Sequence, residues 1–129
     1  MANYLLDSNV LVALANKPSL LGKNTRRILT TEPNIHYSSI SVFELEAKTL
    51  SGKLPKMDSL YAHLVDNQIY EKPFTSVHAL ATSRFKNLDR HDPFDRMLIC
   101  QAAADDYLFI TSDEKLLNLG LPWVISSHE

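Results

Sequence analysis

One stretch near the start of the chain, residues 3–15, reads NYLLDSNVLVALA and introduces the pattern from which the fold follows. Residues 3–6 are mostly apolar and suit a short buried strand, and residues 10–15 form an apolar run that suits a helix. A single acidic residue, Asp7, lies between the two. An unpaired charge beside a buried apolar strand is costly, so the position of Asp7 favours a functional role.

The same alternation of strand and helix continues to the end of the chain. Strands are predicted at residues 3–6, 35–38, 69–71, 107–111 and 123–125. Helices are predicted at residues 10–15, 20–29, 41–50, 58–67, 75–85, 93–104 and 112–119. Ser41 and Thr75 are the expected N-caps of two of these helices. The apolar face expected for the second consists of Val77, Leu80, Ala81 and Phe85.

Strands that alternate with helices favour a mostly parallel sheet with helices on both faces. The 129 residues contain no internal repeat or linker, so we expect one α/β domain over residues 1–129. No apolar run reaches the roughly 18 residues of a membrane span, and the early first strand leaves no room for a signal peptide. The one cysteine, Cys100, lies in an apolar stretch and is expected to be a buried, inert thiol. These features predict a cytoplasmic protein without membrane association.

The net charge of −2 gives no indication of a nucleic-acid partner. Acidic residues, however, follow or precede the predicted elements in a regular way. They are found where predicted strands lead into helices, at Asp7, Glu44, Asp95 and Asp113. In an open α/β sheet, ligands bind outside the carboxyl ends of the strands. Acids that converge there would repel one another unless a hard divalent cation such as Mg²⁺ or Mn²⁺ lay between them.

Each acid also has a simpler explanation as a helix cap. Ser41 and Glu44 fit a capping box, and Asp92 is a natural N-cap for the helix that Pro93 begins. Asp113 stands at another helix start. Capping accounts for acids singly but does not predict a carboxylate after three strands together with an acidic pair that opens the long helix. The whole set therefore favours a metal site.

Four segments, residues 6–10, 41–45, 91–99 and 111–113, carry a resemblance to a known family. They read LDSNV, SVFEL, HDPFDRMLI and TSD, and they resemble the PIN-domain nucleases. Within that family they are similar to the VapC-type toxins of bacterial toxin–antitoxin pairs. The resemblance covers essentially the whole chain. It implies a PIN-like α/β/α sandwich, a Mg²⁺ or Mn²⁺ cofactor, hydrolysis of RNA, a small VapB-like antitoxin and a homodimer.

By position, the resemblance identifies the family's acidic quartet as Asp7, Glu44, Asp95 and Asp113. Asp92 is an extra acid of one bacterial subgroup and a further possible metal ligand. Ser8 keeps the hydroxyl of the family's usual threonine, and Asn9 is a common choice at its position. Asp106 stands at a turn where glycine is frequent, and an aspartate tolerates the left-handed backbone there.

Phosphodiester hydrolysis needs a nucleophilic water, charge neutralisation at the phosphate and help for the leaving oxygen, and carboxylate-bound metals can supply all three. Coordination, directly or through water, is assigned to Asp7, Glu44 and Asp95. Asp113 would hold a second, weaker position or orient water. The hydroxyls of Ser8 and Ser112 would orient the carboxylates.

Three basic residues near these acids keep two explanations each. His91 either contacts the substrate or is a solvated loop residue. Arg96 either contacts the scissile phosphate or forms an ion pair with Asp92, four residues earlier. Lys48 either points to the cleft or pairs with Glu44. Nothing in the sequence identifies the RNA that is cut.

Other functions fit the sequence less well. A phosphatase of the haloacid-dehalogenase type needs a second aspartate where this chain has Asn9. A receiver domain needs an acceptor aspartate after a mid-chain strand, whereas Asp58 stands at a helix start. A PIN-domain nuclease that acts in RNA processing without an antitoxin remains the main alternative.

Overall fold

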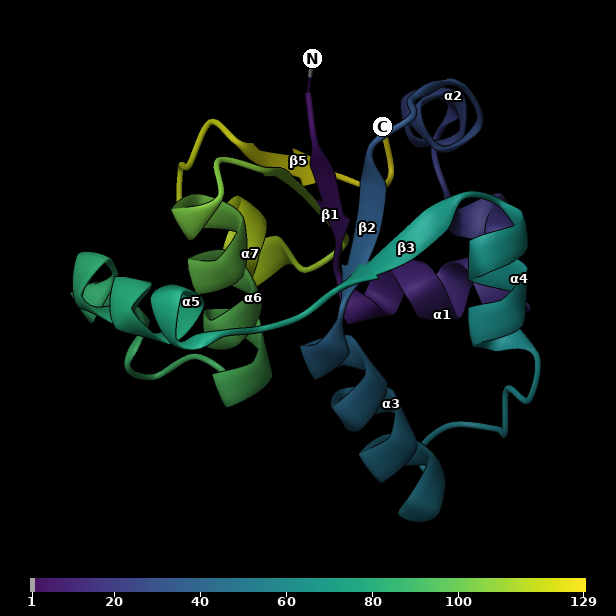
Figure 1. The fold of residues 1–129 in the computed structure, drawn as a ribbon, viewed down its shortest axis with the longest axis horizontal. Coiled ribbons are helices and arrows are strands. Elements are labelled where there is room, and N and C mark those ends of the chain that lie inside the picture. The colour runs from purple at the N-terminus through teal and green to yellow at the C-terminus, as the bar shows by residue number, and fades with distance from the viewer. Residues whose placement is uncertain (1) are drawn as a thin grey trace.

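The computed structural model describes residues 2–129, and its centre is a five-stranded sheet in the order β3-β2-β1-β4-β5 (Figure 1). The strands are β1 (Tyr4–Leu6), β2 (Ile35–Ser38), β3 (Ile69–Lys72), β4 (Leu108–Thr111) and β5 (Val124–Ser126). All four pairings are parallel, and Leu6 of β1 is in register with Tyr37 on one side and Ile110 on the other. Parallel strands end at the same edge, so the residues that follow them are brought together.

Helices cover both faces of this sheet. They are α1 (Ser8–Asn16), α2 (Lys23–Thr31), α3 (Ser39–Leu50), α4 (Leu60–Asp66), α5 (Ser76–Leu80), α6 (Pro93–Ala104) and α7 (Glu114–Leu117). Short 3-10 turns occupy Pro18–Leu20, Ala81–Arg84 and Lys86–Leu88. In Figure 1, α1, α2 and α4 lie on one side of the sheet, and α5, α6 and α7 lie on the other. The expected α/β/α sandwich is confirmed.

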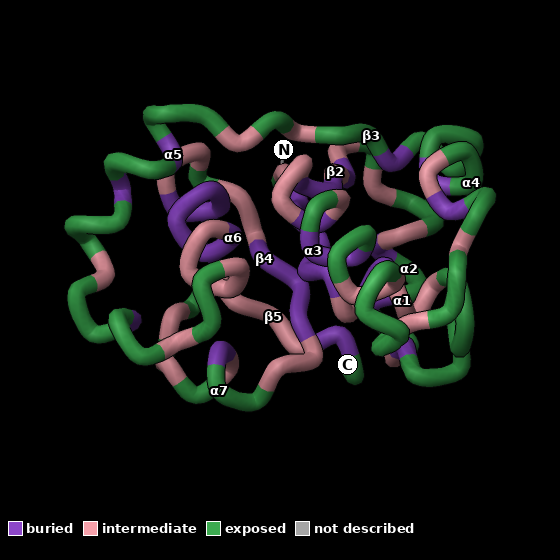
Figure 2. The backbone as a smooth tube through the Cα atoms, turned by 90° about the horizontal axis from the view of Figure 1, so that it is seen from below, coloured by how far each residue is buried: buried purple, intermediate pink, exposed green. Residues whose placement is uncertain are grey.

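The core is divided between the two faces because successive strand side chains point in opposite directions. Leu6 packs with Val10, Leu11 and residues of α2 and α4, whereas Leu5 packs with residues of α6 and α7. Buried residues run through β4 and part of α6, and exposed residues form the periphery (Figure 2). Among the described residues, no helix is both long and apolar enough to span a membrane.

Three local predictions were wrong. The helix expected at residues 20–29 begins only at Lys23, because the preceding residues form a 3-10 turn and an extended link. The helix expected at 75–85 ends at Leu80 and continues as a 3-10 turn. Its expected apolar face is only half right: Ala81 is buried and Phe85 packs on the core, but Val77 and Leu80 are 64% and 76% exposed, and His78 is also buried.

The third error concerns the start of α3. Ser38, rather than Ser41, is its N-cap, and the Ser38 hydroxyl accepts a hydrogen bond from the backbone N–H of Ile40. The capping box predicted for Ser41 and Glu44 is therefore absent, and both side chains are directed elsewhere. Asp106, in contrast, has a φ of 57°, as expected for an aspartate in a left-handed turn.

Candidate active site

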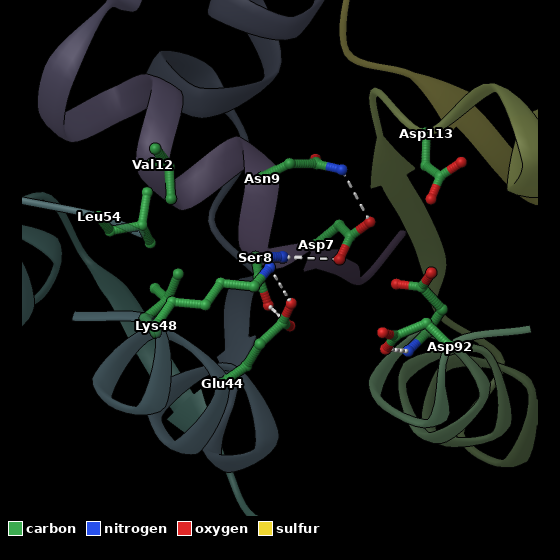
Figure 3. Close-up of a pocket in the computed structure, with 11 residues that line it drawn as sticks. Asp7, Ser8, Asn9, Val12, Glu44, Lys48, Leu54, Asp92 and Asp113 are labelled. Carbon is green, nitrogen blue, oxygen red and sulfur yellow. Dashed lines mark hydrogen bonds and ion pairs between the residues drawn. The ribbon is translucent and has the colours of Figure 1, made fainter. Parts of the chain in front are cut away.

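A pocket of about 330 Å³ opens at the carboxyl edge of the sheet, between α1, α3 and the starts of α6 and α7 (Figure 3). It is lined by Asp7, Ser8, Asn9, Val12, Glu44, Leu45, Lys48, Leu54, Asp92, Asp95 and Asp113. All five acids singled out in the sequence are among these residues. In Figure 3, Glu44 and Lys48 face Asp92 and Asp113 across the pocket, with Asp7 between them.

Asp7 follows β1 directly and is buried. Its carboxylate accepts hydrogen bonds from the Thr111 hydroxyl at 2.6 Å, the Asn9 side-chain amide at 3.1 Å and the Ser8 backbone N–H at 2.7 Å. Burial nevertheless raises the pKa of Asp7 to about 6, against the hydrogen bonds from Thr111 and Ser8 and with help from neighbouring negative charges. The hydrogen bonds thus hold Asp7 in one orientation, while its burial makes it a weaker acid than an exposed aspartate.

Glu44 is buried on α3, and each of its carboxylate oxygens has its own partner. Oε1 accepts a hydrogen bond from the Ser8 hydroxyl at 2.7 Å, and Oε2 accepts one from Lys48 Nζ at 2.7 Å. The hydroxyls of Ser8 and Ser41 are hydrogen-bonded at 2.8 Å, so Ser41 can donate to Ser8 while Ser8 donates to Glu44. The bond to Glu44 raises the pKa of Lys48 and keeps its ammonium charged. Ser8 therefore orients Glu44, and Lys48 pairs with it.

Asp95 lies one helical turn after Asp92 at the start of α6 and is half-buried. Its pKa is raised to about 7, first by burial and then by the negative charges of Asp7, Asp113, Asp92 and Glu44. The repulsion from all four neighbours shows that the acids share one electrostatic environment. Asp95 is the member of the set whose charge is most opposed by the others.

Three of the acids act as helix caps while they line the pocket, and the first is Asp7, the N-cap of α1. Asp92 accepts hydrogen bonds from the backbone N–H groups of Phe94 at 2.8 Å and Asp95 at 3.4 Å, which confirms it as the N-cap of α6. Asp113 caps α7 by accepting from the Lys115 N–H at 2.8 Å. Capping and a functional position are therefore not alternatives here, because each of these carboxylates also faces the pocket.

Thr111, the last residue of β4, was missed as a site residue. Its hydroxyl donates to Asp7 and accepts a hydrogen bond from the Asp113 N–H at 3.0 Å, so it joins two of the acids. The prediction gave this orienting role to Ser112, whose backbone N–H instead donates to Asn9 Oδ1 at 3.2 Å. The strand register that places residues 7 and 111 side by side would have revealed Thr111, but the sequence does not contain that register.

His91 and Arg96 are not among the residues that line the pocket. Arg96 lines a separate apolar pocket between α5 and α6 with Phe74 and Met97. The ion pair expected between Arg96 and Asp92 is absent from the described part of the chain. An aromatic contact instead joins α3 to α6, since the rings of Phe43 and Phe94 have centroids 5.9 Å apart.

The donor set of this pocket suits a hard, hydrated cation. Across residues 2–129, no group of three or more acidic, histidine or cysteine side chains is gathered closely enough to enclose a metal ion. Mg²⁺ does not require such a cage, because it keeps several waters and is commonly held by one or two carboxylates. The oxygen ligands and the mutual repulsion at Asp7 and Asp95 fit Mg²⁺ or Mn²⁺ bound partly through water.

Fold and pocket together define a class: parallel α/β domains whose acidic residues gather at the carboxyl edge of the sheet. The model of the PIN domain family matches residues 4–121, and the chain belongs to that family. Among curated proteins, no sequence match was found.

Three solved structures share this fold with the chain. VapBC2 from Rickettsia felis, bound to a DNA fragment from its promoter, has a TM-score of 0.68 at 20% identity, covering 95% of this chain and 96% of that one. A toxin–antitoxin complex from Klebsiella pneumoniae has a TM-score of 0.67 at 16% identity, and the match covers 98% of this chain and 99% of that one. DNA-bound VapBC from Salmonella typhimurium has a TM-score of 0.66 at 20% identity, and the match covers 98% of this chain and 97% of that one.

Proposed function

We propose that this protein is a Mg²⁺- or Mn²⁺-dependent endoribonuclease and the toxin of a toxin–antitoxin pair. PIN-domain proteins are nucleases as a family, which supports the reaction class. The observation that carries the proposal is the convergence of five carboxylates in one pocket, where burial and mutual repulsion raise the pKa values of Asp7 and Asp95 to about 6 and 7. Acids with pKa values perturbed in this way are typical of functional sites.

Asp7 and Glu44 are the residues that would hold the cation, because hydroxyl donors fix both carboxylates. A divalent cation bound there would neutralise the phosphate and activate a water. Asp95 lines the same pocket and would hold the cation directly or through a bound water. Asp113 and Asp92 add negative charge at the pocket's other side. Attack by water leaves a 5′-phosphate and a free 3′-hydroxyl.

The likeness to toxin–antitoxin complexes supports an antitoxin partner. A small VapB-like antitoxin would inhibit the enzyme by laying an apolar helix in a groove and a basic side chain among the acids. The same proposal includes the homodimer that the family resemblance implies. A PIN-domain nuclease without an antitoxin would have the same pocket. A short neighbouring reading frame that encodes a DNA-binding fold would favour the toxin.

A phosphatase of the haloacid-dehalogenase type is disfavoured by the contacts of Asn9. The side-chain amide of Asn9 donates to Asp7, and its carbonyl accepts from the Ser112 N–H. A second carboxylate at this position would repel Asp7, so the residue orients the first aspartate and does not assist it in acid–base chemistry.

The proposal is tested by RNA cleavage with Mg²⁺ or Mn²⁺. We expect Asp7→Asn and Asp95→Asn to lose activity by more than the roughly 10–100-fold that loss of an outer partner costs. Asp58→Asn is the matched control, because Asp58 is exposed and paired only with Lys56. Equal metal-dependent cleavage by all these proteins would overturn the assignment. Toxicity on expression that is relieved by the product of the neighbouring reading frame tests the antitoxin.

A further inference from the structure

The pocket already contains one positive charge. Lys48 is the only cationic side chain among the described residues that line it, against five carboxylates. Its Nζ lies 2.7 Å from Glu44 Oε2, and the exposed fraction of the side chain is 44% for Lys48 but only 7% for Glu44. The ammonium therefore reaches from the solvent side to a nearly buried carboxylate.

An ion pair between residues four apart on a helix is common and is usually worth a few tenths of a kcal/mol. The Glu44 pair differs from that ordinary case in two respects. Glu44 is buried, and its other oxygen is already occupied by the Ser8 hydroxyl. Lys48 thus occupies Oε2, the Glu44 oxygen to which the Ser8 hydroxyl is not hydrogen-bonded.

We propose that Lys48 is a built-in counter-cation, which binds Glu44 in the metal-free protein and which a divalent metal must displace. Lys48 is then a positioning residue that sets the metal affinity of the site. The inference rests on the proposed metal dependence, but it concerns a different quantity, the competition for Glu44 Oε2. An ammonium and a divalent cation repel each other, so binding both at one carboxylate oxygen costs free energy and the two cations compete.

The test is a calorimetric titration of metal-free protein with Mn²⁺ in the absence of RNA. Lys48→Met removes the charge and keeps the length of the side chain, and it should bind Mn²⁺ about three- to tenfold more tightly. Lys48→Arg keeps the charge and should retain an affinity close to that of the wild type. Lys23→Met removes one charge from exposed α2 and should leave the affinity unchanged.

Thermal unfolding separates this role from that of an ordinary helical ion pair. Without metal, Lys48→Met should unfold at a lower temperature, because the acids lose their counter-charge. With saturating Mn²⁺ the difference from the wild type should close, since the metal supplies that charge. An ordinary ion pair would give the same difference with and without metal. Lys48→Gln provides the same comparison should the methionine variant fold poorly.

The outcomes distinguish this inference from the proposed function. An unchanged or weaker affinity in both neutral variants, with a wild type that binds Mn²⁺, overturns the role of Lys48 and leaves the nuclease proposal standing. A wild type that binds neither Mn²⁺ nor Mg²⁺ overturns the metal dependence itself, and the counter-cation with it.

Discussion

At the scale of single residues, hydroxyl groups decide how the carboxylates differ from one another. Thr111 donates to Asp7, and Ser8 donates to Glu44, so these two acids are fixed in orientation. Asp95 is raised in pKa by burial and by its four acidic neighbours. A pocket of chemically similar acids therefore contains two anchored carboxylates and one with near-neutral acidity.

The raised pKa of Asp95 predicts a pH-dependent stability of the metal-free protein. The folded-state pKa of Asp95 is about 7, against an ordinary 3.8, so ionisation of this carboxyl opposes folding. The resulting loss of stability is absent near pH 4 and complete above pH 7. Asp95→Asn should raise the free energy of unfolding at pH 8 by about 1–2 kcal/mol, because solvent screens part of the repulsion at this half-buried group. Urea unfolding at pH 8 and pH 4 measures it. An equal effect at both pH values, or the same gain from Asp58→Asn, would contradict this origin.

At the scale of elements, the sequence predicted those parts whose burial follows local periodicity. The five strands and α6 were predicted because their apolar runs and caps, such as Asp92, are local signals. The buried face of α5 was not predicted, because it depends on a partner 27 residues away. His78 Nε2 is hydrogen-bonded to Asp105 Oδ2 at 2.7 Å, and its Nδ1 accepts from the Thr75 N–H at 2.9 Å. The local sequence around His78 does not reveal that this residue, and not its apolar neighbours, is the one that is buried.

The hydrogen bond between His78 and Asp105 predicts that the packing of α5 against α6 depends on His78. Burial alone would raise the pKa of Asp105, but hydrogen bonds from His78 and Lys72 outweigh it and hold the pKa below its usual value. His78→Ala removes the buried ring and leaves the Thr75 N–H without its acceptor. We expect the free energy of unfolding to fall by about 1–3 kcal/mol.

Chemical denaturation measures that loss, and His63→Ala serves as the control because His63 is exposed on α4. The control should change the free energy of unfolding by less than about 0.5 kcal/mol. Similar losses in the two variants would show that His78 contributes no more than a surface histidine.

At the scale of the whole molecule, the parallel sheet brings acids from distant parts of the chain to one edge. Their order and their place after the strands were predicted from the sequence. Their partners were not, because the contacts of Thr111 with Asp7 and of Ser8 with Glu44 depend on strand register and helix rotation. The fold thus concentrates negative charge in a single pocket, and the stability of the entire domain is linked to whatever neutralises it.

Divalent metal should therefore stabilise the protein more at high pH than at low pH. At pH 8 the acids are charged, and Mg²⁺ or Mn²⁺ at about 100 times its dissociation constant would add roughly 2.7 kcal/mol. At pH 5, Asp7 and Asp95 are protonated below their pKa values of about 6 and 7, so the gain should largely disappear. Thermal unfolding at both pH values, with NaCl at matched ionic strength, measures this. A gain of the same size at pH 5, or in Asp7→Asn at pH 8, would exclude the carboxylates as its source.

The distance along the chain between β1 and β4 also determines when the pocket forms during protein synthesis. The Thr111 hydroxyl that holds Asp7 is 104 positions further on, and Asp113 comes later still. A nascent chain that has not yet released β4 from the ribosome has no assembled acidic pocket, although Asp7, Glu44 and Asp95 have all been made. The pocket is therefore among the last features of the fold to form, and until β4 pairs with β1 the carboxylates of Asp7, Glu44 and Asp95 have no shared site to occupy.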